Sequence, residues 1–165
     1  DLTLVGLRGN VGTRLAKLDR EEFSAIILAA AGLKRLGLEN RIRSYLSLEE
    51  SLPAPGQGVL GIECREDDIE TQEIIGALNH PETFLTVLAE RAMCARLGGG
   101  CQVPVAAYAE IKQGQLVLRG LVAAPNGEKI LRAHQVGSLN DPEAIGIAAS
   151  LTLKKQGAEA ILNAL

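Results

Sequence analysis

The sequence predicts an α/β protein in which part of a parallel-sheet domain is followed by a small α+β domain with a three-stranded antiparallel sheet. In the first third of the chain, apolar strand-like runs alternate with helical segments, which is the pattern of parallel α/β units. In the second half, a long helix precedes three strand-like stretches joined by glycine-containing turns, and another helix follows. Hydrophobic residues make up 47% of the 165 residues, so the chain has enough apolar side chains for a packed core.

The first third is expected to run strand, helix, strand, helix, strand. The predicted strands are residues 2–7, 24–29 and 43–48. Asn10 follows the first strand and is a suitable N-cap for a helix over residues 11–18. The second helix is expected to stop at Gly37. Ligands of parallel α/β units bind beyond the carboxyl ends of the strands. Arg8 lies just past the first strand, and Arg35 lies in the segment after the second.

A crossing between domains is expected at residues 51–58, which contain two prolines and two glycines. Residues 59–64 resume as a predicted strand. Either Asp67 or Asp68 then caps a helix that reaches about Leu78.

The second half is predicted to form a helix, three antiparallel strands and a final helix. Pro81 fits the first position of the long helix, which ends at Gly98. The predicted strands are residues 103–111, 116–123 and 129–136, with hairpin turns at Gly114 and Asn126-Gly127. Asp141 opens a helix to about Gln156, and residues 158–164 add another turn or two.

Composition excludes several classes of function. The net charge of −3 and the 2% aromatic content argue against nucleic-acid binding. Three cysteines without a C-x-x-C pair and only two histidines argue against a metal site. No apolar run is long enough to cross a membrane and no leader opens the chain, so a cytoplasmic protein is expected. The absence of an initiator Met suggests a piece of a longer protein.

Cys101 follows three glycines and lies between a helix and a strand. Glycines leave room around the thiol, so a large ligand has access to it. A lone cysteine in such a chain is more often an ordinary small residue, as we expect for Cys64 and Cys94. No histidine is close in sequence, and a helix C-terminus does not lower a thiol pKa. The pattern therefore favours a sulfur that holds a group over one that turns over by itself.

Arginines form the second candidate site. Arg8 and Arg14 flank the junction between a strand and a helix, where backbone N–H groups and guanidinium groups bind carboxylate or phosphate. The alternative is a pair of solvated surface arginines. Gln57, between Gly56 and Gly58, is either part of a ligand site or part of a flexible linker.

Several motifs carry a resemblance to one family. They are residues 8–15 (RGNVGTRL), 25–36 (AIILAAAGLKRL), 52–58 (LPAPGQG) and 98–104 (GGGCQVP), with Glu90-Arg91-Ala92 and Tyr108-Ala109-Glu110 beside the last one. By these motifs the chain resembles porphobilinogen deaminase, also called hydroxymethylbilane synthase, over essentially its whole length.

The resemblance implies a three-domain α/β fold whose first two domains are similar to the halves of periplasmic binding proteins. Residues 1–52 would be the carboxy-terminal part of domain 2. Residues 53–79 would be a crossover and a returning segment of domain 1, and residues 80–165 would be domain 3, which carries the cofactor. The full-length protein is expected to be a monomer.

The implied reaction joins four porphobilinogen units into hydroxymethylbilane with loss of ammonia. The chain grows on a dipyrromethane cofactor, which the resemblance places on Cys101 through a thioether. Arg8 and Arg14 match cofactor-binding residues, and Arg35, Arg8 and Gln57 match substrate-binding residues.

No catalytic residue is assigned in this chain, because neither Asp19 nor Asp67 stands in a motif that matches the family's acid–base aspartate. That aspartate belongs to the family's amino-terminal part, so the chain alone is expected to be inactive and to need that part as its partner. The alternative function is a carboxylate-binding module of periplasmic-binding-protein-like fold without a covalent cofactor.

Overall fold

The computed structural model describes residues 2–100 and 103–164. The chain forms two compact units, Asp1–Leu46 and Ser47–Leu165. The helices are α1 (Val11–Asp19), α2 (Ala30–Arg35), the 3₁₀ turn η1 (Glu39–Arg41), α3 (Ile69–Gly76), α4 (Pro81–Arg96), α5 (Pro142–Lys155) and α6 (Ala158–Leu162). The strands are β1 (Val105–Lys112), β2 (Gln115–Ala123) and β3 (Ile130–Ser138). Within the described residues, no helix combines the length and the apolar character that a membrane span requires.

The first unit contains the two helices that the sequence predicts there. The side chain of Asn10 caps α1 by accepting a hydrogen bond from the N–H of Thr13 at 2.8 Å. Helix α2 ends in a Schellman motif, in which Gly37 has a φ of +68° and the Leu38 N–H donates to the Leu33 carbonyl at 2.9 Å. Local side-chain and glycine chemistry therefore determines both helix ends.

Four strands were predicted at residues 2–7, 24–29, 43–48 and 59–64. None of these segments forms a strand in the structure. A strand needs a partner for its backbone N–H and C=O groups, and local sequence does not supply one. The only sheet among the described residues is the three-stranded one of the second unit. The apolar side chains of the unpaired segments are exposed, with Leu4 at 91% and Ile27 at 76%.

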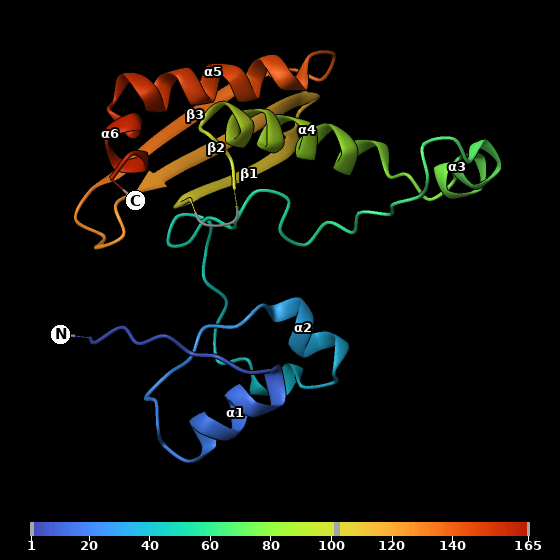
Figure 1. Ribbon diagram of the computed structural model, residues 1–165. Helices are drawn as coiled ribbons and strands as arrows, with labels where there is room; N and C mark the ends of the chain where they lie inside the picture. Colours follow the sequence, from blue (N-terminus) through green and yellow to red (C-terminus); the bar gives the residue numbers. More distant parts are fainter. Residues whose placement is uncertain (1, 101–102, 165) are drawn as a thin grey trace. The chain divides into compact units, whose positions relative to one another are not determined.

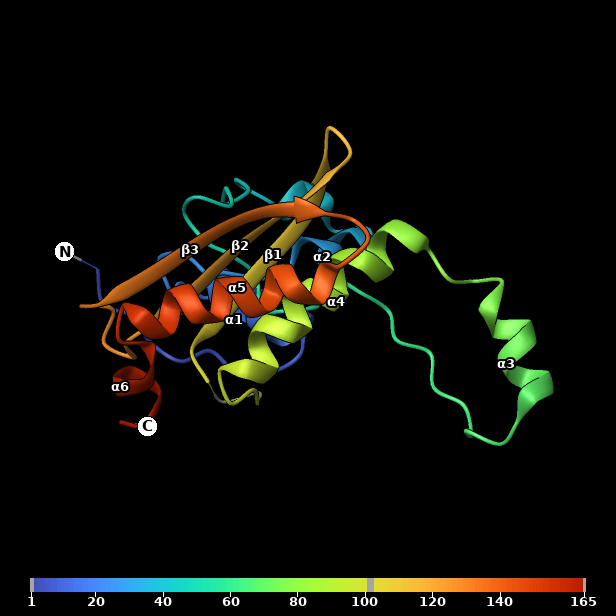
Figure 2. The ribbon, with the colours of Figure 1, turned by 90° about the horizontal axis from the view of Figure 1, so that it is seen from above.

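The second unit is built on an antiparallel sheet with the order β1-β2-β3. The β1–β2 hairpin turns at Gln113 and Gly114, which both have positive φ as a two-residue type I′ turn requires. Ala109 pairs with Leu118 across this hairpin, and Arg119 pairs with His134 across the next one. Helices α4 and α5 lie together on one face of the sheet (Figures 1 and 2).

The core lies between that face and the two helices. Alternate residues of each strand point into it, as the period of two requires. Its fully buried large side chains include Met93 from α4, Leu118 from β2 and Leu153 from α5. Gly146 lets the backbones of α4 and α5 approach closely, since a Cβ there would lie 2.2 Å from the Ala89 carbonyl oxygen.

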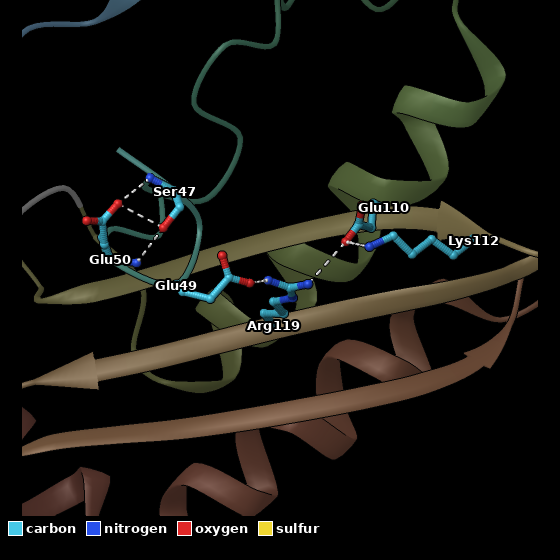
Figure 3. Close-up of polar contacts among 6 residues, drawn as sticks. All are labelled: Ser47, Glu49, Glu50, Glu110, Lys112 and Arg119. Carbon is cyan, nitrogen blue, oxygen red and sulfur yellow. Dashed lines mark hydrogen bonds and ion pairs between the residues drawn. The ribbon is translucent and has the colours of Figure 1, made fainter. Parts of the chain in front are cut away.

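The other face of the sheet carries an ion-pair cluster that holds the incoming chain (Figure 3). Arg119 of β2 pairs with Glu49 at 2.7 Å and with Glu110 of β1 at 3.6 Å. Residues 47–50 form a turn, in which the Glu50 carboxylate accepts from the Ser47 N–H at 2.8 Å. The segment after Ser47 therefore packs with the second unit, whereas the division into residues 1–52, 53–79 and 80–165 stays a prediction.

Candidate cofactor and substrate site

Helix α4 ends in a Schellman motif immediately before the predicted cofactor cysteine. Gly98 has a φ of +86°, its N–H donates to the Ala95 carbonyl at 3.2 Å, and the Gly99 N–H donates to the Cys94 carbonyl at 3.0 Å. The prediction that the helix stops at Gly98 is confirmed. Cys101 itself lies outside the described residues, so its role stays a prediction.

The three glycines before Cys101 have different surroundings. A Cβ on Gly99 would lie 3.0 Å from the Cys94 carbonyl oxygen, whereas a Cβ on Gly98 or Gly100 would meet nothing within 4 Å. An added Cβ at Gly98 or Gly100 would therefore meet no steric conflict with the described residues. The close contact at Gly99 arises because the chain folds back over the last turn of α4, where the Gly99 N–H donates to the Cys94 carbonyl.

The loop before α1 brings Arg14 back toward the residues that follow Arg8. The Nε–H of Arg14 donates to the Gly9 carbonyl at 2.7 Å. Gly9 has a φ of +124°, a conformation that an L-residue rarely adopts. Arg14 is half-buried in this arrangement, and Arg8 is exposed. Arg8 precedes Gly9 in the loop, and Arg14 reaches back to the Gly9 carbonyl from α1.

Arg35 lies on α2 in the same unit. Gly32 of this helix faces the start of α1, where a Cβ would lie 3.9 Å from Val11. Residues three apart share a helix face, so Arg35 lies one turn beyond that contact. Across residues 2–100 and 103–164, the guanidinium groups of Arg8 and Arg35 make no hydrogen bond or ion pair. Their charge is available to an anion.

Gln57 lies in a closed loop of the second unit. Its side-chain oxygen accepts from the Ala54 N–H at 3.0 Å, and its own N–H donates to the Ala54 carbonyl at 3.0 Å. Gly56 and Gly58 on either side both have positive φ. Two hydrogen bonds between Gln57 and Ala54 thus close the loop. Among the described residues, the Nε2 group of Gln57 makes no hydrogen bond, so both of its donors are unused.

A cavity of about 350 Å³ lies beside this loop, within the second unit. Gln57, His80, Thr83, Glu90 and Tyr108 are among the residues that line it. His80 caps α4, because its Nδ1 accepts from the Thr83 N–H at the start of the helix.

Glu90 is a candidate for a structural or functional role that its motif alone did not indicate. It is 6% exposed, and its carboxylate accepts from the N–H groups of Gly56 and Ala109, both at 2.7 Å. Burial raises the pKa of Glu90, and the two N–H donors oppose that rise. The signal was present in the sequence, because Glu90 shares the i, i+3, i+7 helix face of the apolar Met93 and Leu97.

Two family models match the chain in succession. Residues 1–73 match "Porphobilinogen deaminase, dipyromethane cofactor binding domain" and residues 84–155 match "Porphobilinogen deaminase, C-terminal domain". The chain belongs to the porphobilinogen deaminase family. Arg8, Arg14, Arg35 and Gln57 fall in the first matched region of this family, and Glu90 and Cys101 fall in the second.

The porphobilinogen deaminase match makes dipyrromethane the relevant cofactor, and the described residues fit its chemistry. Its two pyrrole rings carry acetate and propionate groups, which are anions that guanidinium groups bind in a bidentate manner. In the first unit, the guanidinium groups of Arg8 and Arg35 are donors of this kind.

Proposed function

We propose that the chain is part of a hydroxymethylbilane synthase, which joins four porphobilinogen units into hydroxymethylbilane and releases ammonia. The observation that carries this proposal is the match of both porphobilinogen deaminase models, in order, over residues 1–73 and 84–155. The general role, a transferase of tetrapyrrole biosynthesis, follows from the family.

Cys101 would hold the cofactor through a thioether bond. When bound, dipyrromethane supplies the primer onto which further pyrrole units are joined. The sulfur is a permanent anchor in this role, so it does not need a neighbouring base or a lowered pKa. Gly100 supports this assignment, because an added Cβ there would meet no described neighbour within 4 Å and no left-handed backbone requires a glycine.

The arginines would bind the carboxylates of cofactor and substrate. Arg8 and Arg14 are proposed for the cofactor, and Arg35, together with Arg8, is proposed for porphobilinogen. Each added pyrrole brings two more carboxylates, so the site needs donors that stay charged at any physiological pH, which arginine provides. Gln57 would contribute its Nε2 donors.

The acid–base carboxylate would come from residues outside this chain, and the first unit would complete a periplasmic-binding-protein-like parallel sheet with further strands. The exposed apolar side chains of residues 2–7 and 24–29 support this proposal, because a sheet that is covered on both faces buries such runs. The 165-residue chain alone would then form no hydroxymethylbilane. We also propose that the full-length enzyme is a cytoplasmic monomer.

Denaturing intact-mass measurement of the full-length enzyme, purified from cells, tests the tether. We expect an adduct with the mass of dipyrromethane in the wild-type protein and in Cys64→Ser, whose exposed thiol serves as the matched control. Cys101→Ser should lack the adduct. An unmodified wild-type protein would favour the carboxylate-binding module, and an adduct that survives in Cys101→Ser would contradict the tether.

A further inference from the structure

A buried carboxylate joins two separate segments of the second unit. The Oε2 atom of Glu90 accepts from the Gly56 N–H, and the Oε1 atom accepts from the Ala109 N–H. Gly56 belongs to the loop that carries Gln57, and Ala109 belongs to the outer edge of β1. Glu90 itself is part of α4. One side chain therefore ties together a helix, an edge strand and the crossing loop.

The outward N–H groups of β1 explain why the loop and Glu90 lie along this strand. β1 is an edge strand of the sheet that the described residues form, so its outward N–H groups require acceptors from outside that sheet. The Ala107 N–H donates to the Pro53 carbonyl at 3.0 Å, and the next outward group, on Ala109, donates to Glu90. The crossing loop reaches β1 directly at one point and through Glu90 at the second.

The chemistry of this position favours a carboxylate over its neutral analogue. Two N–H donors converge on the side chain, and only an ionised carboxylate accepts at both of its terminal atoms. A glutamine would turn an NH₂ group toward one donor and lose that hydrogen bond. Burial of the ionised group is unfavourable by itself, so the two short hydrogen bonds offset a real desolvation penalty.

We propose that Glu90 is a positioning residue that fastens the Pro53–Gly58 loop, and with it Gln57, to the C-terminal domain, so that the loop and the domain move as one body. The ion pair of Glu49 with Arg119 secures the chain just before this loop. Only the contact of Gln57 with substrate rests on the proposed function, because the fastening itself depends on geometry alone.

Amide hydrogen exchange in the 165-residue chain tests the fastening directly. The variant is Glu90→Gln, and the matched control is Glu82→Gln, the same change at an exposed position of the same helix. We expect the Gly56 N–H to exchange about tenfold faster in Glu90→Gln, from loss of one hydrogen bond to a charged group. The Ala107 N–H should follow, because the Pro53 carbonyl leaves with the loop.

The amides of β2 report whether the fold survives, and they should keep their protection in both variants. An unchanged Gly56 N–H in Glu90→Gln would overturn the proposal. A uniform rise in exchange through β1, β2 and β3 would overturn it as well, because Glu90 would then support the whole domain and not the loop.

Kinetics of the full-length enzyme separate this inference from the proposed function. With the loop released, we expect KM for porphobilinogen to rise about fivefold in Glu90→Gln, with little change in kcat, as for a loss of uniform binding. A wild-type enzyme that forms no hydroxymethylbilane would refute the proposed function and leave the exchange result standing. A released loop with an unchanged KM would contradict only the role of Gln57.

Discussion

At the scale of single residues, Gly98 and Gly100 separate a structural need for glycine from a functional one. Gly98 has a φ of +86° because it ends α4, whereas Gly100 has open space and no left-handed backbone. The helix end therefore explains Gly98 without any ligand. Gly100 has no such explanation among the described residues, so it is the glycine that better supports the proposed cofactor.

Substitution of these two glycines by alanine tests that separation. Gly98→Ala should lower the free energy of unfolding by about 1 kcal/mol, since an L-residue is strained in the left-handed region. Gly100→Ala should leave it nearly unchanged, because its Cβ meets no neighbour. Thermal denaturation followed by circular dichroism compares the two. Equal losses in both variants would show that the turn does not distinguish them.

At the scale of elements, the caps of the helices were predictable and the parallel strands were not. Asn10, Asp68 and Asp141 each cap the helix that follows them, because one side chain within three residues satisfies the exposed N–H groups. The hairpin strands were also predictable, since short turns place their partners close in sequence. Residues 2–7 and 24–29 depend on partners that local sequence does not specify.

The same contrast applies to the site. Arg8, Arg14 and Arg35 were predicted from motifs, and all three belong to the first unit. Glu90 was not assigned a role, because its two partners, Gly56 and Ala109, lie 34 and 19 residues away along the chain. A buried glutamate on an apolar helix face was the available clue, but its partners required the fold.

The N-terminal cap of helix α3 is expected to depend on pH, because Asp68 supplies it. The N–H and hydroxyl groups of Thr71 hold the pKa of Asp68 below its usual value. A carboxyl with a lowered folded pKa stabilises the fold above its unfolded pKa, and that contribution is lost as the pH falls through the folded value. We therefore expect the Thr71 N–H to lose protection as the pH drops below about 4.

Asp68→Asn is the control for this titration, since its side chain still accepts a hydrogen bond and has no carboxyl to protonate. NMR-detected amide exchange of Thr71 from neutral to acidic pH should show no step in this variant. An identical pH profile in Asp68→Asn and in the wild-type chain would assign the transition to another group.

At the scale of the whole molecule, the crossing segment belongs with the C-terminal unit. Glu49, the Pro53 carbonyl and the Gly56 N–H each contact that unit, through Arg119, Ala107 and Glu90 respectively. A break within residues 47–58 therefore removes contacts from the C-terminal unit.

Truncation tests this assignment. A chain of residues 47–165 should unfold at the temperature at which the C-terminal unit of the full chain unfolds. A chain of residues 79–165 loses the loop, which leaves the Ala107 N–H without its acceptor and uncovers the Glu90 carboxylate. We expect this second chain to be less stable by about 2 kcal/mol, which is a fall in Tm of roughly 10 °C for a domain of this size. Calorimetry of both chains at equal concentration measures the difference. Equal melting temperatures would mean that the crossing segment adds nothing to the domain, because the outward N–H groups of β1 would then be as well satisfied by water as by the loop.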